Sequence, residues 1–216
     1  DLPLCRSCGQ CFRRNASCCG YCALPLPPAT HSGPHRCCAQ CLQRKPPFDR
    51  VIAPWLYEEQ LGFLIKRWKF HSELELSPLL AELWLSALST APDVDLIIPV
   101  PLHWRRLMHR GFNQSALLCQ HLRRRCPALG QTRSGATWVH RQRATAAQSG
   151  LSAAERECNL LGVFTVQRPC DNLRVAIVDD VMTTGSTAAS MASALRLAGA
   201  AHIEVWCLAR TPAATN

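Results

Sequence analysis

One segment near the C-terminus, residues 174–190, constrains the fold of this chain more than any other. It reads R-V-A-I-V-D-D-V-M-T-T-G-S-T-A-A-S, and its apolar residues at 175–178, mostly β-branched, are typical of a central strand that is buried on both faces. Two carboxylates, Asp179 and Asp180, close the predicted strand. A short loop then leads into the amphipathic segment 188–198, which predicts a helix ended by a glycine. The expected order is therefore strand, acid pair, loop, helix.

The loop between the acid pair and the helix is predicted to bind an anion, because the first N–H groups of a helix have no intrahelical partner and the helix dipole is positive there. Gly185 allows the backbone to approach a ligand closely. The hydroxyl donors of the loop are those of Thr183, Thr184, Ser186 and Thr187. Asp179 and Asp180 could accept hydrogen bonds from two neighbouring sugar hydroxyls, or reach a metal through water. One ligand satisfies both halves of the segment, namely a ribose with a 5′-phosphate.

Three other interpretations compete with this one. Receiver domains also begin with a hydrophobic strand that ends in Asp-Asp, but that strand stands near the N-terminus and is not followed by T-T-G-S-T. A P-loop requires Gly-Lys-Ser/Thr, which does not follow the strand here. The third interpretation is a capped helix without a ligand, which leaves the paired acids unexplained.

The length of 216 residues suits one medium α/β domain with a small appendage, and 48% hydrophobic residues are enough to form a core. The first 20 residues contain no apolar run of signal-peptide length, and no stretch approaches the roughly 18 apolar residues needed to span a bilayer. We therefore expect a cytoplasmic protein that does not insert into membranes. In a reducing compartment, its 14 cysteines indicate metal binding rather than disulfides.

Cysteines are concentrated at the N-terminus, where nine of the 14 fall within residues 5–41. Two C-x-x-C pairs, 19–22 and 38–41, are separated by a loop of 15 residues, a spacing that a structural Zn²⁺ site with four cysteine ligands accepts. The predicted metal ligands include a third pair and are Cys5, Cys8, Cys19, Cys22, Cys38 and Cys41. Three further cysteines leave the ligand set ambiguous, namely Cys11, Cys18 and Cys37. A redox role for the C-x-x-C pairs is the alternative, and it lacks a thioredoxin-like βαβ context.

The cysteine-rich segment, residues 1–47, is expected to be a module of its own, because it has few large apolar residues and a bound metal would supply its folding energy. The proline-rich linker 45–49 marks the boundary, and residues 48–216 form the α/β domain. Further strands of this domain are predicted at 51–57, 95–101, 160–166 and 203–208, and further helices at 61–68, 76–88 and 114–124. The prediction is a parallel sheet with helices on both faces.

Positive charge is concentrated in residues 96–154, which contain no Asp or Glu and carry +9, equal to the net charge of the whole chain (24 − 15). The arginines of this stretch are Arg105, Arg106, Arg110, Arg123, Arg124, Arg125, Arg133, Arg141 and Arg143. Such one-sided charge, all Arg and no Lys, predicts phosphate binding through forked hydrogen bonds. Interleaved aromatic residues also fit a nucleic-acid surface, because bases stack on aromatic rings and guanidinium planes. Outside the stretch, Lys66, Arg67 and Lys69 form either a solvated basic face or part of an anion-binding surface.

Several motifs resemble known protein families. Residues 175–187, V-A-I-V-D-D-V-M-T-T-G-S-T, resemble the phosphoribosyl pyrophosphate (PRPP) loop of type I phosphoribosyltransferases. Residues 99–115, which contain R-G-F-N-Q-S, and residues 141–151, which contain T-x-x-Q-x-x-L, resemble the ComF/GntX group within the phosphoribosyltransferase-like proteins. The N-terminal segment, with C-x-x-C-x-L-P-L and then C-x-x-C-L ahead of P-P-F-D, resembles the same group. The likeness covers nearly the whole chain.

This resemblance implies a type I phosphoribosyltransferase-like sheet, preceded by a small zinc-ribbon-like module. It implies binding of PRPP or ribose 5-phosphate, with Asp179 and Asp180 on the ribose hydroxyls and residues 183–187 on the 5′-phosphate. Arg141 and Arg143 stand in a segment that resembles the flexible loop of such enzymes, and would face the pyrophosphate as catalytic residues. Mg²⁺ would accompany PRPP, and Zn²⁺ would be structural.

Three functions follow as hypotheses. The first is an active or residual phosphoribosyltransferase, for which no acceptor site can be identified in the sequence. The second is a binding module that retains the sugar site but contacts single-stranded DNA, because the ComF group is associated with natural competence and with the use of DNA as a nutrient. The predicted nucleic-acid contacts are Arg105, Arg106, Arg110, Arg123, Arg124 and Arg125. The third is a scaffold whose zinc module docks a competence helicase or another uptake-machinery protein.

Overall fold

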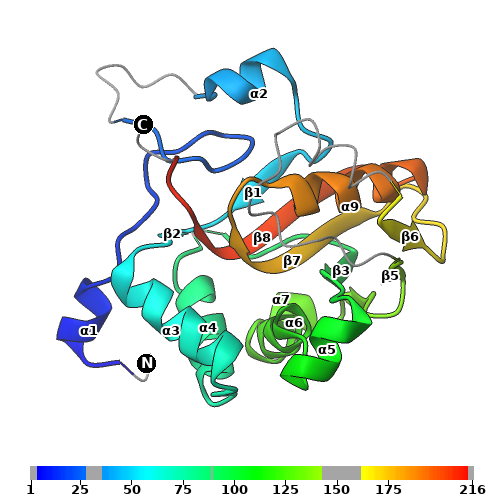
Figure 1. Ribbon diagram of the computed structural model, residues 1–216. Helices are drawn as coiled ribbons and strands as arrows, with labels where there is room; N and C mark the ends of the chain where they lie inside the picture. Colours follow the sequence, from blue (N-terminus) through cyan, green and yellow to red (C-terminus); the bar gives the residue numbers. More distant parts are fainter. Residues whose placement is uncertain (1–3, 28–35, 89, 143–161, 214–216) are drawn as a thin grey trace.

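A computed structural model describes residues 4–27, 36–88, 90–142 and 162–213. At its centre is a sheet of six parallel strands in the order β1-β8-β7-β3-β4, in which β2 also pairs with β8 (Figure 1). The strands are β1 (Arg50–Ile52), β2 (Trp55–Leu56), β3 (Leu96–Pro99), β4 (Arg133–Ser134), β7 (Arg174–Met182) and β8 (His202–Arg210). β7 contains the predicted central strand and lies between β8 and β3, as expected of a segment that is apolar on both faces.

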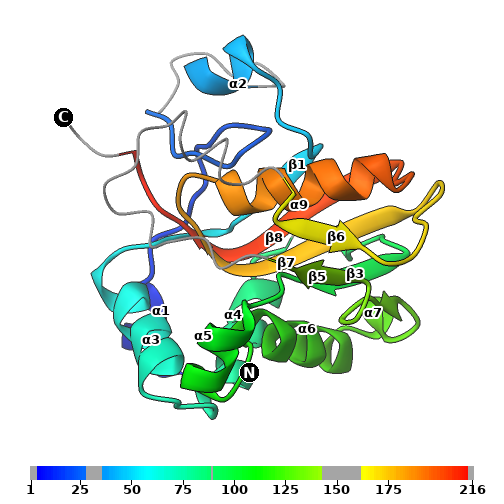
Figure 2. The same cartoon turned by 45° about the vertical axis from the view of Figure 1, so that its right-hand side comes forward.

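Helices cover both faces of the sheet, α9 on one face and α3, α4 and α6 on the other (Figures 1 and 2). The longer helices are α3 (Glu59–Phe70), α4 (Leu76–Leu85), α6 (Gln114–Arg125) and α9 (Ser186–Leu197). Shorter helices are α1 (Arg6–Gln10), α2 (Ala39–Gln43), α5 (Trp104–Arg110) and α7 (Pro127–Gly130). The predicted α/β architecture is confirmed. None of the helices in the described part of the chain has the length and apolar character that crossing a membrane requires.

The protein has two hydrophobic cores, one on each face of the sheet, and successive side chains of β7 point into them alternately. Val175 and Ile177 pack with α9, whereas Ala176 and Val178 pack with α3, α4 and α6. The start of α6 is fixed by Asn113, whose side-chain oxygen accepts hydrogen bonds from the N–H groups at positions 115 and 116, at 3.0 and 3.3 Å. This cap holds the first turn of α6 against the carboxyl end of β7.

Some strand predictions need correction. Residues 164–166 form β6 (Phe164–Val166), which pairs antiparallel with β5 (Val139–Arg141) in a separate two-stranded sheet instead of joining the parallel sheet. The predicted strand 51–57 divides into β1 and β2, because Pro54 between them has no N–H to donate. β7 does not close at the acid pair but continues to its end at residue 182, since β8 accompanies it to residue 210. β3 ends earlier, with Pro99 opposite residue 178, so the acid pair lies beyond the end of β3.

The cysteine-rich segment contacts the α/β domain on two sides. Its first part packs below the sheet, where the ring of Phe12 meets that of Trp55 edge to face at a centroid distance of 6.1 Å. Its second part, with α2, lies on the α9 side, where the buried cysteines join a core that includes Val51 and Ala53 (Figure 1). The predicted domain boundary between residues 47 and 48 stays a prediction.

Candidate functional site

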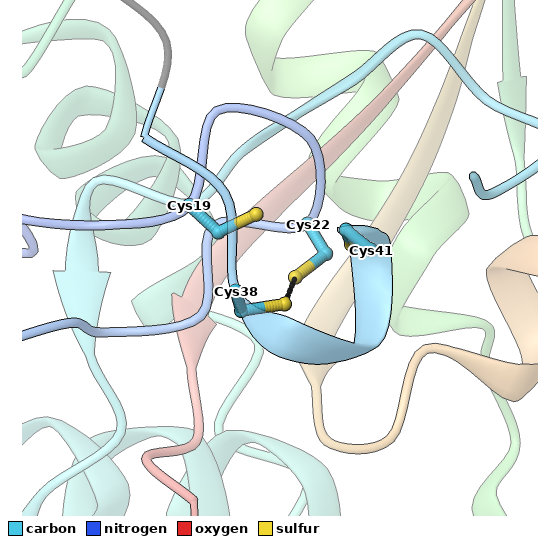
Figure 3. Close-up of side chains that lie close together, drawn as sticks. All are labelled: Cys19, Cys22, Cys38 and Cys41. Atoms are coloured by element: carbon cyan, nitrogen blue, oxygen red, sulfur yellow. Dashed lines mark hydrogen bonds between the residues drawn. The ribbon is translucent and has the colours of Figure 1, made fainter. Parts of the chain in front are cut away.

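Four cysteines from two separate segments meet in one buried cluster, shown in Figure 3. Cys19 and Cys22 come from the first segment, Cys38 is the N-cap of α2, and Cys41 lies within that helix. Their Sγ atoms lie within 4.8 Å of one another, and those of Cys22 and Cys38 are 3.6 Å apart. Sulfur atoms bound to one tetrahedral Zn²⁺ at ~2.3 Å would stand about 3.8 Å apart. The cluster therefore has the ligand number and spacing that a structural metal site needs.

The thiols of this cluster differ in how readily they ionise. Burial opposes ionisation of Cys19, but hydrogen bonds from the backbone of Cys22 and Cys38 prevail and lower the pKa of Cys19 to about 7. Burial raises the pKa of Cys22 to about 11, and burial likewise raises the pKa of Cys41. A bound divalent cation would displace these protons, so metal affinity should fall in acid.

The structure does not bring Cys5 and Cys8 to this cluster. Both are exposed, and Cys5 Sγ accepts a hydrogen bond from the N–H of Cys8 at 3.4 Å, which caps α1. The packing of Phe12 on Trp55 holds α1 beside α3, away from α2 (Figures 1 and 2). The assignment of Cys5 and Cys8 as ligands therefore has no support in this arrangement, and only four of the six predicted ligands meet.

The acid pair at the end of β7 is held by side chains of α3 and α6. Asp179 Oδ1 accepts a hydrogen bond from Ser115 Oγ at 3.1 Å. Asp180 is buried, and its Oδ2 accepts a hydrogen bond from Gln114 Nε2 at 3.1 Å and pairs with Lys69 Nζ at 2.8 Å. The sequence left two interpretations of the basic residues on α3 open, a solvated face and an anion-binding surface. Lys69 fits neither, because its charge is paired with Asp180. Asp179 is partly exposed, whereas Asp180 is not.

Burial, and then the charge of Asp180, raises the pKa of Asp179 to about 7. Because its pKa in the unfolded chain is near 3.9, the folded state binds more protons between about pH 4 and 7, and stability should fall as pH rises through that window. We expect Asp179→Asn, which keeps the acceptor for Ser115, to be more stable than the parent by about 2 kcal/mol at pH 8 and by little at pH 4. Urea unfolding across this range measures the difference, and parallel pH profiles would contradict the assignment.

The loop after β7 contains a glycine, Gly185, in a left-handed backbone conformation that other residues rarely adopt. Gly185 is the N-cap of α9 with φ +82°, and a Cβ at this position would lie 2.6 Å from the Cε atom of Met182. The hydroxyl oxygens of Thr184 and Ser186 are 2.5 Å apart. The capping glycine has no side chain to occupy the N–H groups of the first turn, although the N–H of Ser186 meets Thr184 Oγ1 at 3.4 Å. Thr183 and Thr184 are exposed, and Ser186 and Thr187 are partly buried.

Arginines border the acid pair. Burial and the charge of Arg106 lower the pKa of Arg141, while Asp179 acts in the opposite direction. Burial also lowers the pKa of Arg110, and Asp180 opposes this shift. These influences place Arg141 of β5 within electrostatic range of Asp179 and Arg110 of α5 within range of Asp180, with Arg106 near both arginines. Positive charge therefore gathers beside the acid pair, where a phosphorylated ligand would need it.

Basic and aromatic side chains alternate on an exposed surface that we call the α3–α5 face. Its residues are Phe63, Arg67, Phe70, Trp104, Arg105 and Arg110. No residue of α5 is buried, and Trp104 is 62% exposed. The guanidinium of Arg105 lies 5.3 Å from the centroid of the Trp104 ring, and that of Arg110 lies 5.1 Å from the Phe70 ring of α3. The two helices thus share one surface of stacked arginine and aromatic groups.

The other predicted arginine contacts have different surroundings. Arg123 and Arg124 line a groove of about 650 Å³ beside α6, together with Phe112. Arg125 forms an ion pair with Glu82 at 2.5 Å. Arg143 and the rest of the T-x-x-Q-x-x-L motif lie outside the described residues. The structure thus brings the α5 arginines to one face but does not gather all six predicted contacts there.

Sequence reasoning missed several residues of the site. Gln114 and Ser115, which hold the acid pair, stand in the R-G-F-N-Q-S motif, so a signal for them was present. Lys69 carries no signal that separates it from the neighbouring basic residues of its helix. Arg210, which donates hydrogen bonds to the carbonyl groups of Met182 and Thr183, closes a strand whose pattern is otherwise that of a core.

Several known proteins are similar to this chain in sequence. The chain is 41% identical to DNA utilization protein YhgH of Salmonella typhi over 214 residues, which cover 96% of this chain and 90% of that protein. It is 36% identical to competence protein F of Haemophilus influenzae over 203 residues, which cover 89% of this chain and 84% of that protein. No family model matches the chain.

Two solved structures also show a likeness. One is glutamine PRPP amidotransferase from B. subtilis in complex with ADP and GMP, with 20% identity and a TM-score of 0.37 over 62% of this chain and 25% of that chain. The other is purine phosphoribosyltransferase from Pyrococcus horikoshii, with 18% identity and a TM-score of 0.33 over 69% of this chain and 75% of that chain.

Proposed function

The chain belongs to the family of DNA utilization protein YhgH and competence protein F, and from this premise we propose that it binds PRPP or ribose 5-phosphate and acts in the uptake or use of DNA. One observation carries the sugar-phosphate part. The partly exposed Asp179 and the glycine-capped start of α9 follow one another on a single strand–loop–helix unit, bordered by arginines. Such a unit can bind ribose hydroxyls and a phosphate at the same time.

Each group would have a distinct task. Asp179 would accept hydrogen bonds from ribose hydroxyls, while Asp180, paired with Lys69, would act mainly by positioning the strand end and its charge. The N–H and hydroxyl groups of residues 183–187 would hold the 5′-phosphate. In phosphoribosyl transfer, the bond from ribose C1 to pyrophosphate breaks as a bond to the acceptor forms, and negative charge gathers on the pyrophosphate. Arg141 and Arg143 would neutralise it, and Mg²⁺ bound with PRPP would supply further positive charge.

We further propose that the four-cysteine cluster holds a structural Zn²⁺. Cysteine thiolates in tetrahedral arrangement are the usual ligands of structural zinc, and the buried Sγ atoms have the required spacing. The module has few large apolar residues, so metal binding would contribute much of its folding free energy.

Calorimetry with PRPP and Mg²⁺ tests the sugar-phosphate site. We expect Asp179→Asn to weaken binding by about tenfold or more, because a charged acceptor for the ribose hydroxyls is lost. Asp171→Asn is the matched control, since Asp171 is exposed and precedes the opposite end of β7, and it should bind as the parent does. Equal heats in parent and Asp179→Asn would refute the assignment. Release of pyrophosphate in the presence of nucleobases, ammonia or glutamine then shows whether turnover follows.

The α3–α5 face supports a second candidate function, the binding of single-stranded DNA. Stacked arginine and aromatic groups on an exposed basic helix suit unpaired bases and their phosphates. We expect the affinity to fall steeply with salt, and the slope of log K against log salt to shrink by roughly 0.7 for each of Arg105→Gln and Arg110→Gln. Arg168→Gln is the control, because Arg168 also stacks on an aromatic ring, that of Trp138, away from α5. Salt-independent binding would exclude this candidate.

A further inference from the structure

Arg210 is a buried cation at the end of β8. It is 5% exposed, whereas arginine is rarely buried to this extent without a partner. In the sheet it pairs in register with Met182, the last residue of β7 before residues 183–187, which we call the phosphate loop. The backbone of β8 therefore delivers this side chain to the point where the loop begins.

Within the described part of the chain, the guanidinium of Arg210 donates its hydrogen bonds to backbone carbonyl groups. Its Nε donates to the carbonyl of Cys22 at 3.1 Å. Its Nη1 donates to the carbonyls of Met182 at 3.0 Å and Thr211 at 2.9 Å, and also to that of Thr183. One guanidinium thus joins a cysteine of the cluster to the first residues of the phosphate loop.

The charge of Arg210 fits a metal-loaded cluster. Carbonyl dipoles alone compensate a buried cation poorly. Four thiolates around one divalent cation carry a net charge of about −2, and the metal would fix the position of Cys22 and of its carbonyl group. Because Arg210 Nε donates a hydrogen bond to the carbonyl of Cys22, a bound metal would strengthen the electrostatic interaction between the cysteine segment and this guanidinium.

The hydrogen bonds to Met182 and Thr183 also orient the loop. In a planar trans peptide, the carbonyl of one residue and the N–H of the next point in opposite directions. Fixing the carbonyls of Met182 and Thr183 on Arg210 therefore turns the N–H groups of Thr183 and Thr184 away from it. The Met182 carbonyl also accepts a hydrogen bond from the N–H of Thr211 at 3.0 Å, so Arg210 acts mainly on the Thr183 carbonyl and thereby on the direction of the Thr184 N–H.

We propose that Arg210 is a positioning residue that couples metal occupancy of the four-cysteine cluster to the shape of the phosphate loop. In the metal-loaded chain the loop holds its anion-binding form, and loss of the metal releases it. The consequence for ligand affinity rests on the proposed function, but the coupling of cluster and loop does not.

Hydrogen exchange of the full chain tests the coupling without any ligand. In the parent, removal of Zn²⁺ with a chelator should speed exchange in residues 182–187 by about tenfold or more, while β3 and α4 stay protected as internal references. In Arg210→Lys, loop exchange should already be fast with Zn²⁺ bound and should not change when the metal is removed, because an ammonium cannot bridge the carbonyls as a planar fork does. Arg174→Lys is the matched control at the opposite end of β7, where Arg174 pairs with Asp95, and it should behave as the parent does.

Two outcomes would overturn the coupling: loop exchange in the parent that is the same with and without zinc, or an Arg210→Lys loop that still responds to zinc. The first outcome needs only the parent, so it decides the matter even if the variant does not fold. Calorimetry with ribose 5-phosphate tests the effect on ligand binding. Removing zinc should weaken binding to the parent by about tenfold. Absence of binding to the zinc-loaded parent would refute the proposed function, while the exchange result would still decide the role of Arg210.

Discussion

Cys22→Ser is expected to release the bound zinc and to lower Tm by about 10 °C or more. The cluster is part of the same core as Val51 and Ala53, so a metal-free cluster would loosen the packing above the sheet as well as the cysteine segment. Structural zinc binding is worth on the order of 10 kcal/mol in small peptides, and a chain of this size changes Tm by about 2–4 °C per kcal/mol. Even a fraction of the binding free energy therefore gives a large shift. Metal analysis and thermal unfolding of the same preparation measure both effects.

Cys5→Ser is the matched control for this prediction. Cys5 is exposed at the start of α1 and lies outside the cluster, so its substitution should leave the zinc content unchanged and Tm within about 1 °C of the parent. If Cys5→Ser released the metal as Cys22→Ser does, the wider ligand set predicted from the sequence would be right and the four-cysteine set wrong.

The local part of the site could be predicted from the sequence because its determinants are consecutive. The apolar run of β7, the acid pair and the glycine cap of α9 follow one another along the chain, and the structure places them in that order. The same holds for the two C-x-x-C pairs, whose spacing alone predicted that they meet. Such short-range patterns predict the structure well because the hydrogen bonds and the burial that they specify lie within one strand–loop–helix unit.

Contacts between distant segments could not be predicted in this way. Nothing near Cys5 indicates that Phe12 packs on Trp55 and carries α1 away from the cluster. Of the strand predicted at 160–166, residues 164–166 form β6, but its antiparallel partner, β5, was not identifiable from that segment. Lys69 reaches the acid pair only because folding brings the last turn of α3 within 2.8 Å of Asp180. In each case tertiary packing decides among several options that local pattern leaves open.

Lys69→Met is expected to destabilise the fold by about 3 kcal/mol, because it leaves the carboxylate of Asp180 buried with only the amide of Gln114 as a side-chain partner among the described residues. The double variant Lys69→Met/Asp180→Asn removes both charges and should recover most of this loss, to within about 1 kcal/mol of the parent. Lys66→Met, on the exposed side of the same helix, is the control and should change stability by less than about 0.5 kcal/mol. Urea unfolding at constant pH provides all four values.

The Lys69→Met variant also bears on the proposed ligand site. The charge of Lys69 lowers the pKa of Asp179, against the burial and the charge of Asp180 that raise it, and thus favours the carboxylate that the ribose hydroxyls would meet. Lys69→Met should therefore weaken PRPP binding most near neutral pH, where Asp179 would then carry a proton, and less at pH 9. A loss of stability without any change in the pH profile of binding would show that Lys69 serves only the fold. Recovery of binding at high pH would show instead that a lysine on α3 keeps the acid pair of β7 charged for its ligand.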